Sequence, residues 1–106
     1  MRFGEVLDCM AASPFVNNPN IPNDERPRYR KFRRKAWGPS IQYIFLTAET
    51  KVPVDKWQGD LPPFNNGKHI LINLRIDMIG GDGSLLVGWM PYQYEMLVDD
   101  WEEVTE

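Results

Sequence analysis

Apolar residues recur at helical spacing near the start of the chain. Four of them occupy positions i, i+3, i+4 and i+7, and these are Phe3, Val6, Leu7 and Met10. This spacing is the stripe that an amphipathic helix buries. Because a residue that precedes proline avoids helical geometry, Ser13 before Pro14 is expected to end the helix. The pattern predicts one short helix with a single buried side.

Further along, the pattern takes the two-residue period of β-strands. In residues 29–35 one side would carry Lys31 and Arg33, and the other Phe32 and Arg34. Residues 41–47 are β-branched and aromatic on both sides, which predicts a central strand. Residues 52–54 predict a short edge strand, because Pro53 cannot donate to a strand ladder.

The clearest alternation runs through residues 69–78, which predicts one continuous strand. Its polar side would present Asn73, Arg75 and Asp77 in a row, away from the core. The glycine-rich residues 80–83 favour a hairpin turn, and residues 84–89 would return as the partner strand.

The C-terminal part predicts a single helical turn after Pro91 and a last strand at residues 99–104. The fold class is therefore α+β, with a short N-terminal helix and a mostly antiparallel sheet of about four or five strands. A C-terminal hairpin and a short helical turn complete it. With 106 residues, the chain is expected to form one domain, residues 1–106.

An extended loop is expected at about residues 13–30. Its first part, residues 13–27, holds four prolines and four asparagines without periodicity. Loops of this length tend to be functional flaps or disordered insertions. The single cysteine, Cys9, cannot form an internal disulfide, and no apolar run is long enough to span a bilayer. We therefore expect a cytoplasmic protein that does not contact membranes.

Charge is distributed unevenly. The net charge is -3, yet seven of the twelve Lys and Arg residues lie in residues 26–35. This basic run could bind nucleic acid, neutralise the acidic C-terminal strand, or line a pocket for a compact phosphorylated ligand. A sequence pI near 5.1 argues against a nucleic-acid module, so that partner stays the alternative.

No catalytic or metal-binding motif is present. His69 is the only histidine and has no recognisable nucleophile placed beside it. No group of residues has the spacing of metal ligands, and no cofactor motif occurs. Trp89 follows a glycine at a predicted strand end, where a ring face would be exposed at the rim of the sheet.

The chain resembles a known family of small phage proteins, the Thoeris anti-defense domain of the second type. The N-terminal half contributes "FGEVL" at residues 3–7 and "RRKAWG" at residues 33–38. The C-terminal motifs are Asp82-Gly83-Ser84, Gly88-Trp89, Pro91, Gln93, residues 95–97 and residues 100–102. The chain departs from the family pattern in its longer loop at residues 13–30, and in Tyr92 and Glu95, where many members have serine and aspartate.

The resemblance implies a non-enzymatic protein of the cytoplasm of an infected bacterium. Such proteins sequester cyclic ADP-ribose signals made by bacterial TIR immune proteins, and some also hold cyclic oligonucleotides of other defence systems (CBASS). They form homo-oligomers, typically tetramers. An enzyme that degrades such signals ranks lower, because no catalytic residues are evident.

The implied pocket would stack a nucleotide on Trp37 and Trp89. Arg34 would contact a phosphate, and Gln93 would be a polar contact near the rim. The strand pattern adds Asn73 and Asp77 as candidates to bind ribose hydroxyls or base edges. No catalytic residue, metal ligand or cofactor is predicted.

Overall fold

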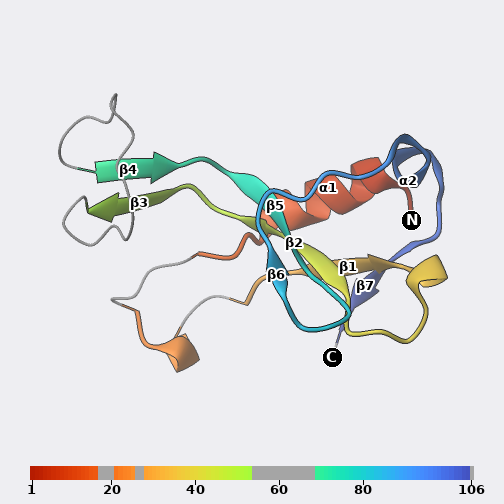
Figure 1. Ribbon diagram of the computed structural model, residues 1–106, viewed down its shortest axis with the longest axis horizontal. Coiled ribbons are helices and arrows are strands. Elements are labelled where there is room, and N and C mark those ends of the chain that lie inside the picture. Colours follow the sequence, from red (N-terminus) through yellow and green to blue (C-terminus); the bar gives the residue numbers. More distant parts are fainter. Residues whose placement is uncertain (17–20, 26–27, 54–68, 106) are drawn as a thin grey trace.

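Two helices and a five-stranded antiparallel sheet form the described body of the protein, as the computed structural model shows (Figure 1). Residues 1–16, 21–25, 28–53 and 69–105 are described. The elements of the body are α1 (Phe3–Ala12), β1 (Lys31–Arg34), β2 (Tyr43–Thr47), β5 (Arg75–Ile79), β6 (Leu85–Leu86), α2 (Gln93–Leu97) and β7 (Trp101–Val104). The strand order is β6-β5-β2-β1-β7, so β2 is central as predicted. The predicted α+β class is confirmed.

Two further strands form a separate ribbon. β3 (Thr50–Pro53) pairs antiparallel with β4 (His69–Ile72), and this ribbon extends away from the body (Figure 1). Short 3-10 helices occur at Asn23–Glu25 and Lys35–Trp37, labelled η1 and η2. Only parts of the predicted loop at residues 13–30 fall within the described residues. There, Phe15 forms a parallel bridge with Thr47, so this part of the segment lies against the end of β2.

The N-terminal helix buries the side that the sequence predicted. Phe3, Val6 and Met10 are buried in the main core, and the helix ends before Ser13 as expected. The same core includes four residues of the sheet, Phe32, Ile44, Met78 and Trp101. Leu7 is the exception within the predicted stripe, because 39% of its surface remains exposed at the edge of the helix.

Alternation along β1 divides the basic run between the two sides of the sheet. Phe32 and Arg34 are buried on the side that faces α1, whereas Lys31 and Arg33 are only partly buried. β1 lies beside β7, and the register places Arg33 opposite Glu102 and Arg34 opposite Trp101. The basic and acidic segments of the sequence are thus neighbours in the sheet.

Ion pairs join these two segments. Arg30 Nε lies 2.8 Å from Glu103 Oε2, and Arg33 Nε lies 3.0 Å from Glu102 Oε1. A third pair forms where Arg34 Nε donates to Asp100 Oδ1 at 2.9 Å. The interpretation that the basic run neutralises the acidic C-terminal strand across the sheet is therefore confirmed.

The prediction of one continuous strand at residues 69–78 is wrong. The segment is divided into β4 and β5, which pair in different sheets, and Asn73 and Leu74 lie between them. Leu74, on the apolar side of the alternation, is 58% exposed, and Asp77, expected on the polar side, is only 2% exposed. Alternation indicates extended backbone but does not identify the partner strand. It could not show that the first half of this segment pairs in the ribbon and the second half in the main sheet.

The predicted hairpin is confirmed, with a shorter second strand. Gly80 N–H donates to Ser84 O at 2.8 Å, and Gly83 has a φ of +83°, which favours glycine. β6 ends after Leu86 rather than at residue 89, and Gly88 then turns the chain with a φ of +73°. The helical turn and the last strand follow as α2 and β7, in agreement with the sequence.

Candidate ligand-binding site

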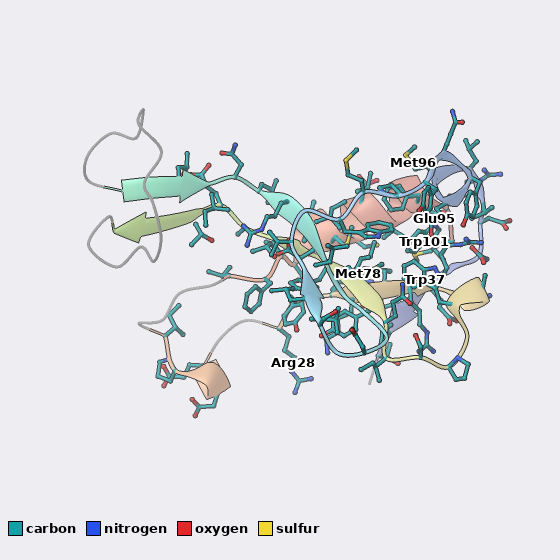
Figure 2. The ribbon with its side chains drawn as sticks, in the orientation of Figure 1. Arg28, Trp37, Met78, Glu95, Met96 and Trp101 are labelled. Atoms are coloured by element: carbon teal, nitrogen blue, oxygen red, sulfur yellow. The ribbon has the colours of Figure 1, made fainter. Side chains whose placement is uncertain are left out.

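Three tryptophans from distant parts of the chain converge beside α2. The ring centroids of Trp37 and Trp101 are 5.4 Å apart, and those of Trp89 lie 6.2 Å and 6.3 Å from the other two. All three pairs are edge-to-face, an arrangement that aromatic rings prefer. Figure 2 shows Trp37 and Trp101 together with Glu95 at this end of the molecule. We call these three residues the tryptophan cluster.

The cluster has a buried base and two partly exposed members. Trp101 is only 1% exposed and also contacts the ring of Phe3, at a centroid distance of 5.2 Å. Trp37 and Trp89 are half-buried and pack against the main core. Their accessible surfaces are therefore held in place from below, which suits them to stack on a planar group.

Asp100 fixes the turn that carries Trp37. Its backbone oxygen accepts a hydrogen bond from Lys35 N at 2.9 Å, and its carboxylate Oδ2 accepts one from Ala36 N at 3.3 Å. Gly38 closes η2 with a φ of +71°, and its N–H donates to Lys35 O. The sequence "RRKAWG" thus forms a strand end followed by a tight turn that directs the indole into the cluster.

Arg34 lies opposite Trp101 in the register of β1 and β7 and belongs to a partly buried ion-pair network. Its Nε and one terminal nitrogen donate to the two carboxylate oxygens of Asp100, at 2.9 Å and 3.1 Å. Its other terminal nitrogen is 3.9 Å from Glu95 Oε2, and the guanidinium lies 5.4 Å from the ring centroid of Tyr94. Hydrogen bonding to Arg34 holds the pKa of Asp100 below its ordinary value.

Glu95 connects α2 to the cluster. Its side chain is 6% exposed and accepts a hydrogen bond from Tyr92 N at 2.9 Å, at the start of the helix. Its backbone oxygen accepts a hydrogen bond from the indole Nε1 of Trp101 at 2.8 Å. Most side chains of the short helix are exposed. The hydrogen bonds of Glu95 therefore cap it and hold it against the sheet.

Asp77 positions the chain that leads to Trp89. Its Oδ1 accepts hydrogen bonds from Gly88 N at 3.0 Å and from Arg75 Nε at 3.1 Å, and its Oδ2 accepts one from Thr47 Oγ1 at 2.7 Å. Trp89 N–H then donates to Ile76 O at 2.8 Å. Both carboxylate oxygens are used within the protein, so this residue supports the site from below.

The six predicted ligand-binding residues do not all meet. Trp37 and Trp89 meet in the cluster, Arg34 lies opposite Trp101 in strand register, and Gln93 is exposed at the start of α2. Asp77 lies behind Trp89, whereas the exposed Asn73 lies in the connection from β4 to β5, toward the ribbon (Figure 1). Ligand contact by these residues stays a prediction.

Two members of the site were not predicted as such. The sequence indicated Trp101 only within the family motif at residues 100–102, and Glu95 only as a departure from the family pattern. The position of Trp101, an apolar residue four positions after the helical turn, was a usable sign that it packs beside that turn. The sequence held no sign that Glu95 is buried, because an acidic side chain is ordinarily exposed.

The described residues offer no cluster suited to a metal ion and no membrane-spanning helix. Within residues 1–16, 21–25, 28–53 and 69–105, no group of three or more His, Cys, Asp or Glu residues could hold a metal ion. Over the same residues, no helix has the length and apolar character needed to cross a membrane. Cys9 is a free, partly buried cysteine of α1.

A small α+β domain with an aromatic cluster beside its C-terminal helix is thus defined. The sequence model of the Thoeris anti-defense 2-like domain matches residues 1–104, almost the whole chain. The protein belongs to this Thoeris anti-defense family, and the resemblance inferred from its motifs is confirmed. No curated protein sequence matches the chain.

Proposed function

We propose that this protein binds and sequesters cyclic ADP-ribose-type signals of bacterial defence systems, and cyclic oligonucleotide signals as a second ligand class. Membership of a Thoeris anti-defense family supports a role against such a system. The proposed action is binding without chemical change, in the cytoplasm of the infected bacterium. The signal would be withheld from the effector that it activates.

The observation that carries this proposal is the tryptophan cluster. Trp37 and Trp89 are half-buried, and both contact the buried ring of Trp101. Rings that are already fixed lose little freedom when a ligand binds, so more of the stacking energy contributes to affinity. Stacking of a base on an aromatic side chain contributes roughly 1–3 kcal/mol. The cluster therefore suits the adenine of a nucleotide signal.

Arg34 can contribute to phosphate binding in a specific way. Its bidentate contact with Asp100 is short, but the contact with Glu95 is longer, at 3.9 Å. We propose that a phosphate oxygen replaces Glu95 at this terminal nitrogen, while Asp100 keeps the guanidinium in place. Gln93, exposed on the adjoining helix, would bind a sugar hydroxyl or a base edge at the rim.

A homo-oligomer, in the form of a tetramer, is part of the proposal. Large apolar side chains are exposed from β6 to α2, with exposed fractions between 45% and 83%: Leu85, Leu86, Val87, Met90, Tyr92, Tyr94, Met96 and Leu97. Runs of exposed apolar surface of this kind mark interaction sites in soluble proteins. Trp89 lies within the run, so a second copy that covers it would also enclose the ligand.

Calorimetry with purified protein tests the proposal. Cyclic ADP-ribose, its glycocyclic isomers and a cyclic dinucleotide are titrated separately into protein at micromolar concentration. A sponge must compete with an effector, so we expect a dissociation constant in the nanomolar range, about -12 kcal/mol. The absence of heat with every one of these ligands would overturn the proposal.

Recovery of the ligand separates sequestration from degradation. The complex is heated to denature the protein, and the released nucleotide is compared with the starting compound by chromatography and mass spectrometry. A sponge returns an unchanged ligand in stoichiometric amount. Conversion to a different nucleotide would show an enzyme instead.

The nucleic-acid alternative has weaker support. Arg30, Arg33 and Arg34 are all engaged with carboxylates, so much of the positive charge of the basic run is neutralised within the protein. Single-stranded DNA and RNA should therefore migrate unshifted in a gel with this protein at low salt. A retarded probe whose shift disappears with added salt would restore this alternative.

A further inference from the structure

A groove opens on the side of the sheet that faces away from α1. Its volume is about 390 Å³, and it is formed by β1, the connection from η2 to β2, the start of β2 and the end of β7. Lys31, Arg33, Tyr43 and Val104 alternate with buried residues of the main core, so they lie on the opposite side from the tryptophan cluster. The groove is therefore distinct from the site proposed above.

One wall of the groove is cationic. Lys31 Nζ lies 5.4 Å from the ring centroid of Tyr29 and 5.2 Å from that of Tyr43. No carboxylate of the described residues forms an ion pair with this ammonium group. The two phenol rings hold it in place by cation–π attraction, without neutralising its charge.

Arg33 adds donors to the same wall. Its Nε donates to Glu102 Oε1 at 3.0 Å. Its two terminal nitrogens have no hydrogen-bond partner within the described part of the chain. A guanidinium with both terminal nitrogens available binds the oxygens of a phosphate bidentately. Lys31 and Arg33 are two residues apart on a strand, so their backbone positions are about 7 Å apart, and one phosphate can lie between the two side chains.

The remaining walls are neutral. Ile41 and Val104 contribute apolar surface, and Gln42 contributes an amide. Tyr43 contributes a ring whose pKa is raised to about 12, chiefly because burial disfavours the phenolate and also because of its contact with Tyr29. Its phenol stays uncharged at neutral pH, so it adds no negative charge that would repel an anion.

We propose that this groove is a binding site for a compact phosphomonoester. The phosphate would lie between Lys31 and Arg33, and a small apolar body would rest on Ile41 and Val104. The volume lies near the lower end of the range for small-molecule pockets, about 300–1,000 Å³, so the groove suits a single compact ligand rather than a polynucleotide.

Titrations with phenyl phosphate, followed by ¹H–¹⁵N NMR of the full chain, test the site. The expected amide shifts cluster at residues 31–33, 41–43 and 104 and saturate with one equivalent bound. Inorganic phosphate should bind the same residues at least tenfold more weakly, because it lacks the apolar body, and benzyl alcohol should produce no shifts there. Shifts scattered over the surface, or confined to the tryptophan cluster, would overturn the proposal.

Three variants complete the test. Lys31→Met removes the charge, keeps most of the stem and breaks no ion pair, so affinity for phenyl phosphate should fall about tenfold or more without loss of the fold. Lys35→Met, an exposed base of the adjoining η2, is the matched control and should bind as the parent does. An equal loss in both variants would show non-specific attraction and overturn the site. Trp89→Phe should bind phenyl phosphate unchanged, which separates this proposal from the one above.

Discussion

The carboxylate of Asp77 accepts a hydrogen bond from the backbone N–H of Gly88, at 3.0 Å, directly before Trp89. The same carboxylate accepts hydrogen bonds from Thr47 on β2 and from Arg75 on β5. One buried side chain thus joins the centre of the sheet to the segment that places an indole in the tryptophan cluster. We expect Asp77 to affect the proposed ligand binding through the position of that ring.

Replacing Asp77 should destabilise the protein. Asp77→Ala leaves a hydroxyl, a guanidinium and a backbone N–H without their acceptor, and each buried unsatisfied group costs roughly 1–3 kcal/mol. We expect the free energy of unfolding to fall by about 3 kcal/mol or more, measured by urea denaturation. Asp99→Asn, at an exposed aspartate near β7, is the control and should change it by less than about 0.5 kcal/mol. Equal stability of both variants would contradict the role assigned to Asp77.

The exposed surface of Trp89 should contribute measurably to ligand affinity. Trp89→Ala removes a stacking surface that contributes roughly 1–3 kcal/mol, so affinity for a cyclic ADP-ribose-type ligand should fall by about 5- to 150-fold in calorimetry. Trp89→Phe keeps a smaller ring and should lose less. Thermal unfolding of each variant identifies any loss that comes from misfolding. Unchanged affinity in a folded Trp89→Ala variant would place the ligand elsewhere.

Two adjacent arginines of β1 should differ sharply in their effect on stability. Arg34→Ala leaves Asp100 and the buried Glu95 without their cation, and breaking a buried pair costs about 3–5 kcal/mol. Arg33→Ala breaks a more exposed pair with Glu102, which contributes about 0–1 kcal/mol. Urea denaturation of the two variants in parallel measures the difference. Similar losses would show that the burial of Arg34 carries no special weight.

Acid should weaken the sheet through its ion pairs. Arg34 lowers the pKa of Asp100 and Arg30 lowers that of Glu103, in each case mainly by hydrogen bonding to the carboxylate. A lowered folded-state pKa gives stability that is present above the ordinary values of 3.8 and 4.5 and is lost as the pH falls through the folded-state values. Urea midpoints should therefore be level from pH 7 to about pH 5 and decline below it. Asp100→Asn should make this decline shallower, and an unaltered slope would contradict the assignment.

The exposed apolar run from β6 to α2 should determine oligomeric state. Leu97→Glu places a charge at a side chain that is 70% exposed in the single chain, so burial against a second copy would become unfavourable. Light scattering after gel filtration should show a tetramer for the parent protein and smaller species for this variant. Leu71→Glu, at a 51% exposed leucine of the β3–β4 ribbon, is the control. A monomeric parent protein would overturn the proposed oligomer.

Local patterns predicted the elements well, because their causes are local. The stripe on α1, the central strand at β2 and the glycine turn before β6 each depend on residues near one another in the sequence. The division between β4 and β5 depends on which distant strand each half meets, and alternation carries no such information. The sequence therefore did not predict the break between β4 and β5.

The site was predictable only in part. The motifs indicated Trp37 and Trp89, which do meet in space, and Arg34, which lies opposite Trp101 in the register of β1 and β7. The burial of Asp77 and the position of Trp101 under both indoles arise from strand register, which no short motif encodes. The basic run was open to three interpretations, and the adjacency of β1 and β7 shows the pairing with the acidic strand, while phosphate binding stays a proposal.

The alternation along β1 also limits how this strand can change in length. Arg33 and Arg34 are consecutive, one partly exposed beside the groove and the other buried on the side of the sheet that carries the tryptophan cluster. Insertion or deletion of one residue in the strand would turn every following side chain to the opposite side. The guanidinium of Arg34, now paired with Asp100, would then face the groove. A neighbouring side chain would enter the core in its place, without a matched acceptor. Substitutions within β1 (Lys31–Arg34) can thus alter the tryptophan cluster or the groove separately, whereas a change in the length of the strand would disturb both at once.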